Sequence, residues 1–404
     1  MEVVPRKRRP YSTLEKLEMK KTLVALAALA SVSAFAQVTI TGNLDFAGAR
    51  FGGTMNGNKG TTITTGHGTS STSAINISAT EDIGGGTKIT AFYGIDPRTF
   101  ANDGLGVTNN VATAVTIPNG VVATGLARHD VYVGASGAFG TLRVGAPNAP
   151  GLDANGIGQP LGTGVGSGFG GASANTLMSR SINARYSRSV RYDTPVMSGL
   201  SGHFQFAPGG DQAAVVAGTT SYGALHYPNA RRATEVALRY SNGPLNAMVV
   251  NIRGSASTNS AGYLSIGANA AATTAVGATN YNLVAANYNL GNTTIYASMG
   301  NGGSINQASA STALKSDKSS RYGVKHSMGP VDLMVAYTKV QTATLGITGT
   351  VNQVNTGFRG DYNLSKTSAV YLGYEKYDSG SAMTTTSVAD GTRSITSVGL
   401  RKSF

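Results

Sequence analysis

From residue 37 to its end, the chain repeatedly alternates apolar and polar residues with a period of two. In the first such segment, Val38, Ile40, Leu44 and Phe46 alternate with Thr and other polar residues. A period of two gives a β-strand one apolar and one polar face. The pattern therefore predicts many half-apolar strands. It fits a soluble β-sandwich as well as a barrel whose apolar face meets lipid.

The lengths of the connections favour the barrel. Seven short turns, most with Gly or Pro, are expected at 82–86, 136–140, 195–199, 242–244, 290–292, 328–330 and 364–366. Eight long polar loops are expected at 52–71, 99–126, 148–183, 209–231, 257–278, 303–317, 341–350 and 380–391. Alternating short periplasmic turns and long external loops are typical of outer-membrane barrels, whereas a sandwich has no reason to sort its loops by length. We expect an all-β fold, a sixteen-stranded transmembrane antiparallel β-barrel. Its strands are expected at 38–51, 72–81, 87–98, 127–136, 141–147, 184–194, 200–207, 232–242, 245–256, 279–290, 292–302, 318–328, 331–340, 351–364, 367–379 and 392–404. Their polar faces, which include Arg359 and Arg401, are expected to turn inward.

The amino-acid composition excludes several classes of function. The chain has 404 residues, 54 of them Gly, and no Cys. Disulfide frameworks, thiolate metal sites and Cys nucleophiles are therefore excluded. The net charge of +13 falls to +9 without residues 1–36, which hold seven basic and three acidic residues. These charges are scattered singly, so we interpret them as solvated loops and pore walls and expect no nucleic-acid partner.

The N-terminal region reads as an export signal. Residues 19–36 combine Lys20 and Lys21, an apolar run from Leu23 to Ala30, and a small-x-small site ending at Ala36. This is the pattern of a removable signal peptide, too short to span a bilayer. Residues 1–18 contain a basic cluster that resembles a nuclear signal, but we interpret them as a misassigned extension before a start at Met19. The barrel is expected over 37–404.

The last strand ends in an aromatic residue on its apolar face. Val398, Leu400 and Phe404 share one parity, interrupted by Lys402, which can extend to the periplasmic interface. With the signal peptide and the alternation, a terminal Phe indicates export to the outer membrane as a multi-pass β-barrel. Lipid and lipopolysaccharide are then expected to surround it.

Signals for catalysis are absent from the sequence. The five His residues are isolated, and none has the spacing of metal ligands. Gly166, Gly168 and Gly171 match a dinucleotide fingerprint by count only, inside a Gly-rich loop. We expect no enzyme, no catalytic residue, no metal and no cofactor. An enzymatic barrel such as an outer-membrane lipase stays a remote alternative.

The ordered motifs resemble those of a known family, the general trimeric porins of Gram-negative bacteria, in particular the beta-proteobacterial type. The stretches that carry the resemblance are VTITG at 38–42, TEDIGGGTK at 80–88, GAFGT at 137–141, SVRYDTP at 189–195, YNLSKT at 362–367 and VGLRKSF at 398–404. The resemblance implies a homotrimer of sixteen-stranded barrels. It also implies a third loop, here 148–183, folded into the lumen to form a constriction.

In such porins, acidic groups of that loop face a ladder of Arg on the barrel wall. This chain departs from the pattern, because Asn43, Ala74 and Ala146 stand where the family usually has basic residues. The loop itself holds one acid, Asp153. We therefore expect a weak transverse field, with a pore constriction formed by Asp153, Arg128, Arg143 and Arg185. The alternative is that these four are solvated charges without a special role.

The resemblance implies passive transport of small hydrophilic solutes and ions through a water-filled pore. Two other interpretations stay open. One is a substrate-specific channel on the same barrel, and the other is a structural or adhesive outer-membrane barrel without transport. Neither the solute nor the ion selectivity follows from the sequence, although the departures above favour selection by size with at most a mild anion preference.

Overall fold

The structure is a computed structural model. It describes residues 37–55, 58–67, 69–95, 129–168, 182–186, 188–208, 232–254, 279–303, 314–344, 350–378 and 391–404. The expected extension, the signal peptide, Arg128 and part of the third loop lie outside these residues. Among the described residues, no helix has the length and hydropathy to cross a membrane.

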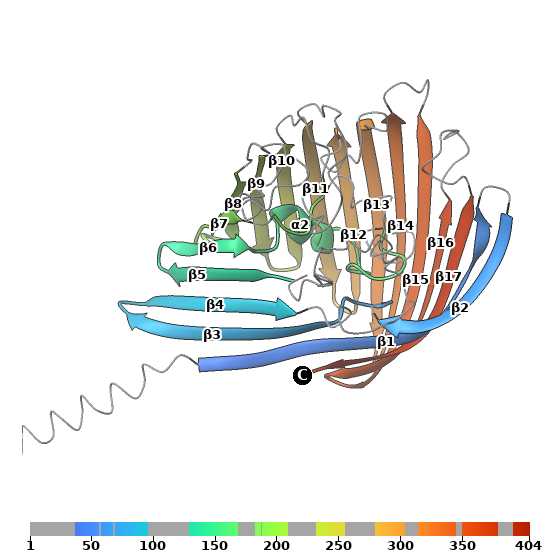
Figure 1. The fold of residues 1–404 in the computed structure, drawn as a ribbon, viewed down its shortest axis with the longest axis horizontal. Helices are drawn as coiled ribbons and strands as arrows, with labels where there is room; N and C mark the ends of the chain where they lie inside the picture. Colours follow the sequence, from blue (N-terminus) through green and yellow to red (C-terminus); the bar gives the residue numbers. More distant parts are fainter. Residues whose placement is uncertain are drawn as a thin grey trace, which may run out of the picture.

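The elements are strands with one short helix (Figure 1). Their bounds are β1 Gln37–Met55, β2 Asn58–His67, β3 Ala74–Gly84, β4 Thr87–Ile95, β5 Val131–Gly137, β6 Gly140–Ala146, α2 Pro150–Ile157, β7 Ser189–Asp193, β8 Leu200–Ala207, β9 Ala233–Asn242, β10 Leu245–Gly254, β11 Thr279–Leu290, β12 Thr293–Gly302, β13 Leu314–Met328, β14 Val331–Thr344, β15 Val351–Ser365, β16 Ser368–Asp378 and β17 Thr392–Ser403.

All strands belong to one antiparallel sheet that closes on itself. Each strand from β3 to β17 pairs with its neighbour in the chain, and β17 pairs with β1 from Asn43↔Ser403 to Gly53↔Arg393. The terminal Phe404 completes the seam, because it exchanges backbone hydrogen bonds with Gly42 at 2.8 and 3.0 Å. Closure leaves no sheet edge exposed, as a membrane requires. The predicted sixteen-stranded antiparallel barrel is confirmed.

The described residues contain seventeen strand segments because one barrel strand is divided. β2 pairs with the outer half of β1, up to His67↔Phe46, and β3 pairs with the inner half, from Ala74↔Asn43. The ladder therefore breaks between His67 and Ala74, opposite only two residues of β1. β2 and β3 are thus two parts of the second barrel strand. The expected long loop at 52–71 is wrong over 58–67, which forms β2.

The barrel exposes its apolar side chains and buries its polar ones. Val133 and Val398 are 58% and 57% exposed, while Glu235 and Asn355 are fully buried. A soluble domain has the opposite arrangement. Here the outward side chains form the apolar surface that lipid covers, and the inward ones meet water and the chain segment within the barrel.

The strands differ in length around the barrel. β5 to β8 have five to eight residues, whereas β13 to β15 have 14 or 15. The expected strands 200–207 and 279–290 coincide with β8 and β11. The expected strands 127–136 and 184–194 are too long, because β5 begins at Val131 and β7 spans only Ser189–Asp193. The short and long walls thus lie in different parts of the barrel.

Candidate functional site

Residues 149–168, which we call the inner loop, lie against the inner face of the barrel wall. A methyl group on Gly158 would meet Ser298 of β12, and one on Gly168 would meet Thr338 of β14. Both wall residues have the parity opposite to the exposed Met299 and Tyr337. The inner loop therefore packs on the polar face of the sheet, the face turned away from lipid.

The inner loop begins with the helix α2, which contacts β8 to β11. Pro150 at its first turn lacks the N–H that would be unsatisfied there. Ala154 is fully buried and Ile157 nearly so, in a cluster with Ile252 and Leu283 of the wall. The helix could not be predicted from the sequence, because its eight residues include two Gly and a Pro, and its stability comes from this packing.

A buried carboxylate holds the start of α2. Glu235 of β9 accepts a hydrogen bond from the Gly151 backbone N–H at 2.7 Å and another from the Tyr186 hydroxyl at 2.6 Å. The residue is fully buried. Its two oxygens thus tie the helix and the segment after the third loop to the same strand.

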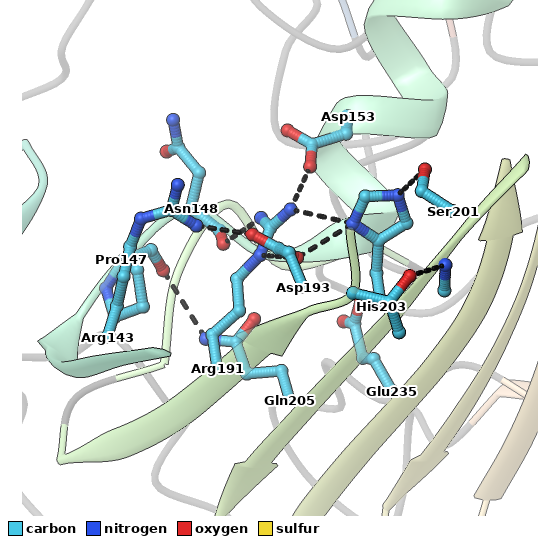
Figure 2. A network of polar contacts seen from close by, with 12 residues as sticks. Arg143, Pro147, Asn148, Asp153, Arg191, Asp193, Ser201, His203, Gln205 and Glu235 are labelled. Atoms are coloured by element: carbon cyan, nitrogen blue, oxygen red, sulfur yellow. Dashed lines mark hydrogen bonds and ion pairs between the residues drawn. The ribbon is translucent and has the colours of Figure 1, made fainter. Parts of the chain in front are cut away.

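Next to this contact lies an ionic cluster, which we call the anchor network: Arg143, Asp153, Arg191, Asp193 and His203 (Figure 2). Arg191 of β7 is central. Its Nη2 lies 2.7 Å from Asp153 Oδ2 on α2, its Nε lies 2.9 Å from Asp193 Oδ1, and its Nη1 donates to the Asn148 carbonyl at 2.7 Å. One guanidinium therefore joins the helix, the wall and the start of the loop.

Asp193 completes the anchor network. It accepts a short ionic hydrogen bond from Arg143 of β6, and its Oδ1 lies 2.7 Å from His203 Nδ1 of β8. The His203 Nε2 in turn contacts the Ser201 hydroxyl at 3.1 Å. Two arginines and two aspartates thus compensate one another, and the network presents little uncompensated charge to the lumen.

The far end of the inner loop is held on the other side of the barrel. The Gly166 N–H donates to Glu375 Oε2 of β16 at 2.6 Å, and the Val165 N–H donates to the Thr69 carbonyl at 2.8 Å. Gly166 and Gly357 of β15 meet backbone to backbone, and a methyl group on Gly357 would lie 2.4 Å from Gly166 Cα. Glycine at 357 is therefore what lets the loop reach the wall.

Between the inner loop and this wall is a cavity of about 360 Å³. Its polar lining comes from Ser70, Ser71, Asn155, Thr163, Arg359 and Arg401. We call it the donor cavity. Arg401 of β17 donates to the Ser70 hydroxyl at 3.2 Å and to Asp361 Oδ2 at 3.1 Å, while Arg359 of β15 donates to the Ser70 carbonyl at 2.7 Å.

Ser70 and Ser71 form one side of the donor cavity because a buried aspartate draws them inward. Asp45 of β1 accepts hydrogen bonds from the Ser70 and Ser71 N–H groups, both at 2.7 Å, and from the Tyr371 hydroxyl at 2.5 Å. Asp45 is fully buried. This explains why the second barrel strand is interrupted at that level.

The chain matches a family model described as Gram-negative porin over residues 22–382, which is most of its length. The chain belongs to the Gram-negative porin family. It is therefore an outer-membrane protein with a multi-pass β-barrel, and both family and fold are those of a channel rather than an enzyme. Among the described residues of this porin, no group of three or more His, Asp or Glu is placed to hold a metal ion.

Several solved structures resemble the porin in fold. The anion-selective porin from Comamonas acidovorans aligns with 18% identity and a TM-score of 0.63, over 91% of this chain and all of its own. The trimer form of OmpT from Vibrio cholerae aligns with 14% identity and a TM-score of 0.56, over 92% of this chain and all of its own. OmpF from Salmonella typhi gives 12% identity and a TM-score of 0.58, over 92% and 98%. No curated protein matches the porin in sequence.

Only part of the predicted constriction set comes together in this porin. Asp153 and Arg143 share the anchor network, linked through Arg191 and Asp193. Arg185 instead pairs with Asp130, with Nε 2.5 Å from Oδ1. Arg128 lies outside the described residues. The role of the four in a constriction stays a prediction.

The arginines that contact the inner loop and the donor cavity were not among the site residues predicted from the sequence. Arg191 lies in the motif at 189–195, between the outward Val190 and Tyr192, so its inward parity was available as a signal. Arg359 and Arg401 were correctly expected to face inward. The sequence does not show how far along the barrel axis an inward residue lies relative to the inner loop. The position of Arg359 and Arg401 at the cavity could therefore not be predicted.

The three departures from the family pattern have different surroundings. Asn43 donates to the Ser71 hydroxyl at 2.6 Å, beside the donor cavity. Ala74 is buried at the first residue of β3, and Ala146 ends β6. At the donor cavity, the positive charge of the described wall comes from Arg359 and Arg401.

Proposed function

We propose that this porin is a general diffusion pore for small hydrophilic solutes and ions, and that the inner loop narrows it. The observation that carries the proposal is the inner loop itself. It packs from α2 on β9 to Gly166 on β15 and leaves a cavity beside it whose lining includes two arginines. A structural barrel has no need for a chain segment within its lumen.

The predicted weak transverse field is part of this proposal. Asp153 is the one acid in 148–183, and it forms an ion pair with Arg191. The donor cavity on the other side has arginine but no carboxylate in its lining. We infer selection by size with an anion preference. That the structurally similar porin from Comamonas acidovorans is anion-selective supports the same direction.

We also infer a homotrimer. A strand of five to eight residues rises about 17 to 26 Å, and a tilted one covers less of the roughly 25 Å apolar band of an outer membrane. The wall of β5 to β8 is therefore short for lipid, and contact with another copy would cover its exposed Val133 and Val144. One similar structure is a trimer form of OmpT. Light scattering of the detergent-solubilised protein is expected to give three protomers.

Export by the signal peptide at 19–36 belongs to the proposal as well. We expect the mature chain to begin at Gln37, with 1–18 never translated. N-terminal sequencing of the protein from outer membranes tests this directly. A mature chain that still carries the cluster Arg6 to Arg9 would contradict it.

Swelling of liposomes that contain the purified protein tests transport. With neutral sugars of rising mass, a diffusion pore gives swelling rates that fall smoothly with solute size. A substrate-specific channel would give one solute a rate far above that curve, with saturation. A structural or adhesive barrel would give no swelling above that of protein-free liposomes.

A further inference from the structure

The polar groups that line the donor cavity are predominantly hydrogen-bond donors. Arg359 and Arg401 have no acceptor atoms in their side chains, and Ser70, Ser71 and Thr163 add hydroxyls. No Asp or Glu lines the cavity among the residues that the structure describes. Such a lining is unfavourable for a cation and favourable for an anion with several acceptor oxygens.

Asn155 of α2 adds a second, independent observation. The residue is almost fully buried, and its Nδ2 makes no hydrogen bond within the described structure. Its Oδ1 accepts from Arg321 Nη1 of β13 at 2.5 Å. Since Arg321 requires an acceptor, the amide cannot reverse, and its NH₂ group stays an unpaired donor in a residue that lines the cavity.

Arg321 also adds positive charge behind Asn155. It is fully buried, and its other hydrogen bond runs from Nε to the Ser298 hydroxyl at 2.8 Å. Among the described residues, no carboxylate forms an ion pair with Arg321. A buried guanidinium without a counter-charge is costly, and a nearby anion would lower that cost.

The carboxylates near the other two arginines lie behind them. Asp361 has a side-chain exposure of 3%, whereas that of Arg401 is 24%. Arg359 Nε lies 2.9 Å from Asp361 Oδ1 without the alignment of a hydrogen bond, so this contact is ionic only. The charge that meets the lumen at this point is therefore that of Arg401.

We propose that the donor cavity is a binding station for a small oxyanion in transit, held by Arg401, Asn155 Nδ2 and the Ser70 and Ser71 hydroxyls. This inference rests on the proposed function, because it concerns a solute that passes through the pore. Inorganic phosphate, sulfate and small carboxylates share the required chemistry, with two or more acceptor oxygens on a compact anion. Chloride lacks that geometry.

The test uses inorganic phosphate as the probe. Chloride current through the purified full-length porin is recorded in planar bilayers while phosphate replaces part of the chloride at constant ionic strength. We expect a saturable block. Arg401→Gln and Asn155→Asp should each raise the half-blocking concentration about tenfold or more, as expected for one lost charge-assisted hydrogen bond.

The variants are chosen to separate binding from folding. Asn155→Asp keeps the shape of the side chain and an acceptor for Arg321, but it replaces the lone donor by a carboxylate oxygen. Arg239→Gln is the matched control, because Arg239 also faces inward, on β9, and binds Asn246 rather than the cavity. It removes the same charge and should leave the block unchanged.

Conductance without saturable block would overturn the binding station and leave the pore intact, as would equal block in all variants. Absence of conductance would overturn the proposed function instead. In that case, calorimetric titration of the detergent-solubilised protein with phosphate decides the site. Binding that weakens in Arg401→Gln and Asn155→Asp supports it, and no binding overturns it.

Discussion

The anchor network and the donor cavity hold the same charges in opposite arrangements. Each region combines two arginines with two aspartates. Asp153 and Asp193 belong to the network, and Asp45 and Asp361 contact residues that line the cavity without lining it themselves. In the anchor network, arginine pairs with both acids and fixes the inner loop to the wall. At the cavity, both acids are buried, whereas Arg401 is partly exposed. We infer from this difference that the ion selectivity of the pore depends on which charged side chains reach the lumen, and not on the sum of the charges.

The largest effect is expected when the anchor network is broken. Arg191→Ala leaves Asp153 and Asp193 without their shared partner, and we expect a loss of about 3 kcal/mol in the free energy of unfolding. Urea unfolding in detergent measures it. Open-channel current noise should also rise, because α2 loses a contact to the wall.

Arg253→Ala serves as the control for that loss. Arg253 of β10 is exposed, and its Nε contacts only Asn251 at 2.9 Å among the hydrogen bonds of the described residues. Equal urea midpoints for the two variants would show that the anchor network does not hold the loop.

A smaller effect is expected where the loop meets the wall by close approach. Gly357→Ala would force the inner loop away from β15, since the new methyl group would overlap the Gly166 backbone. We expect a cost of about 1 to 3 kcal/mol and a changed single-channel conductance. Gly360→Ala, on the same strand, adds a methyl group 3.5 Å from Leu333 and should change neither. Identical behaviour of the pair would argue against a wall-bound loop tip.

The smallest effect is expected at Glu375, and it sharpens the contrast between ionic and neutral anchoring. Glu375→Gln keeps a side-chain oxygen that can accept from the Gly166 N–H, while it replaces the buried carboxyl group by a neutral amide. We expect a change within about 1 kcal/mol in the free energy of unfolding. A loss as large as that of Arg191→Ala would mean that the tip depends on charge as the anchor network does.

The barrel followed from the sequence because its strands obey one rule throughout. Period-two alternation identified the strands even where the apolar residues are few, as in 351–364. β2 was not predicted as a strand because its sequence, NKGTTITTGH, has only one large apolar residue, Ile63. Its pairing depends on β1 beside it, which is a tertiary effect.

The candidate site could be predicted from the sequence only in part, because it too depends on tertiary contacts. Alternation gives the face of each residue but not its height in the barrel, so it could not distinguish Arg191 and Arg401 from inward residues elsewhere. Arg185 was expected at the constriction, and its partner is Asp130. The path of the inner loop depends on buried Glu235 and Glu375 and on glycines in the wall, and these contacts are far apart in the chain.

We propose that the protein forms a water-filled pore that the inner loop narrows and that presents positive charge on the wall at Arg401. Single-channel recording of the purified protein in a potassium chloride gradient tests it most directly. We predict discrete conductance steps, grouped in threes, and a zero-current potential with the sign of greater chloride permeability. Arg401→Gln should move that potential toward zero, and Arg239→Gln should move it much less. A protein that inserts without conductance, or a pore that prefers potassium, would contradict the account.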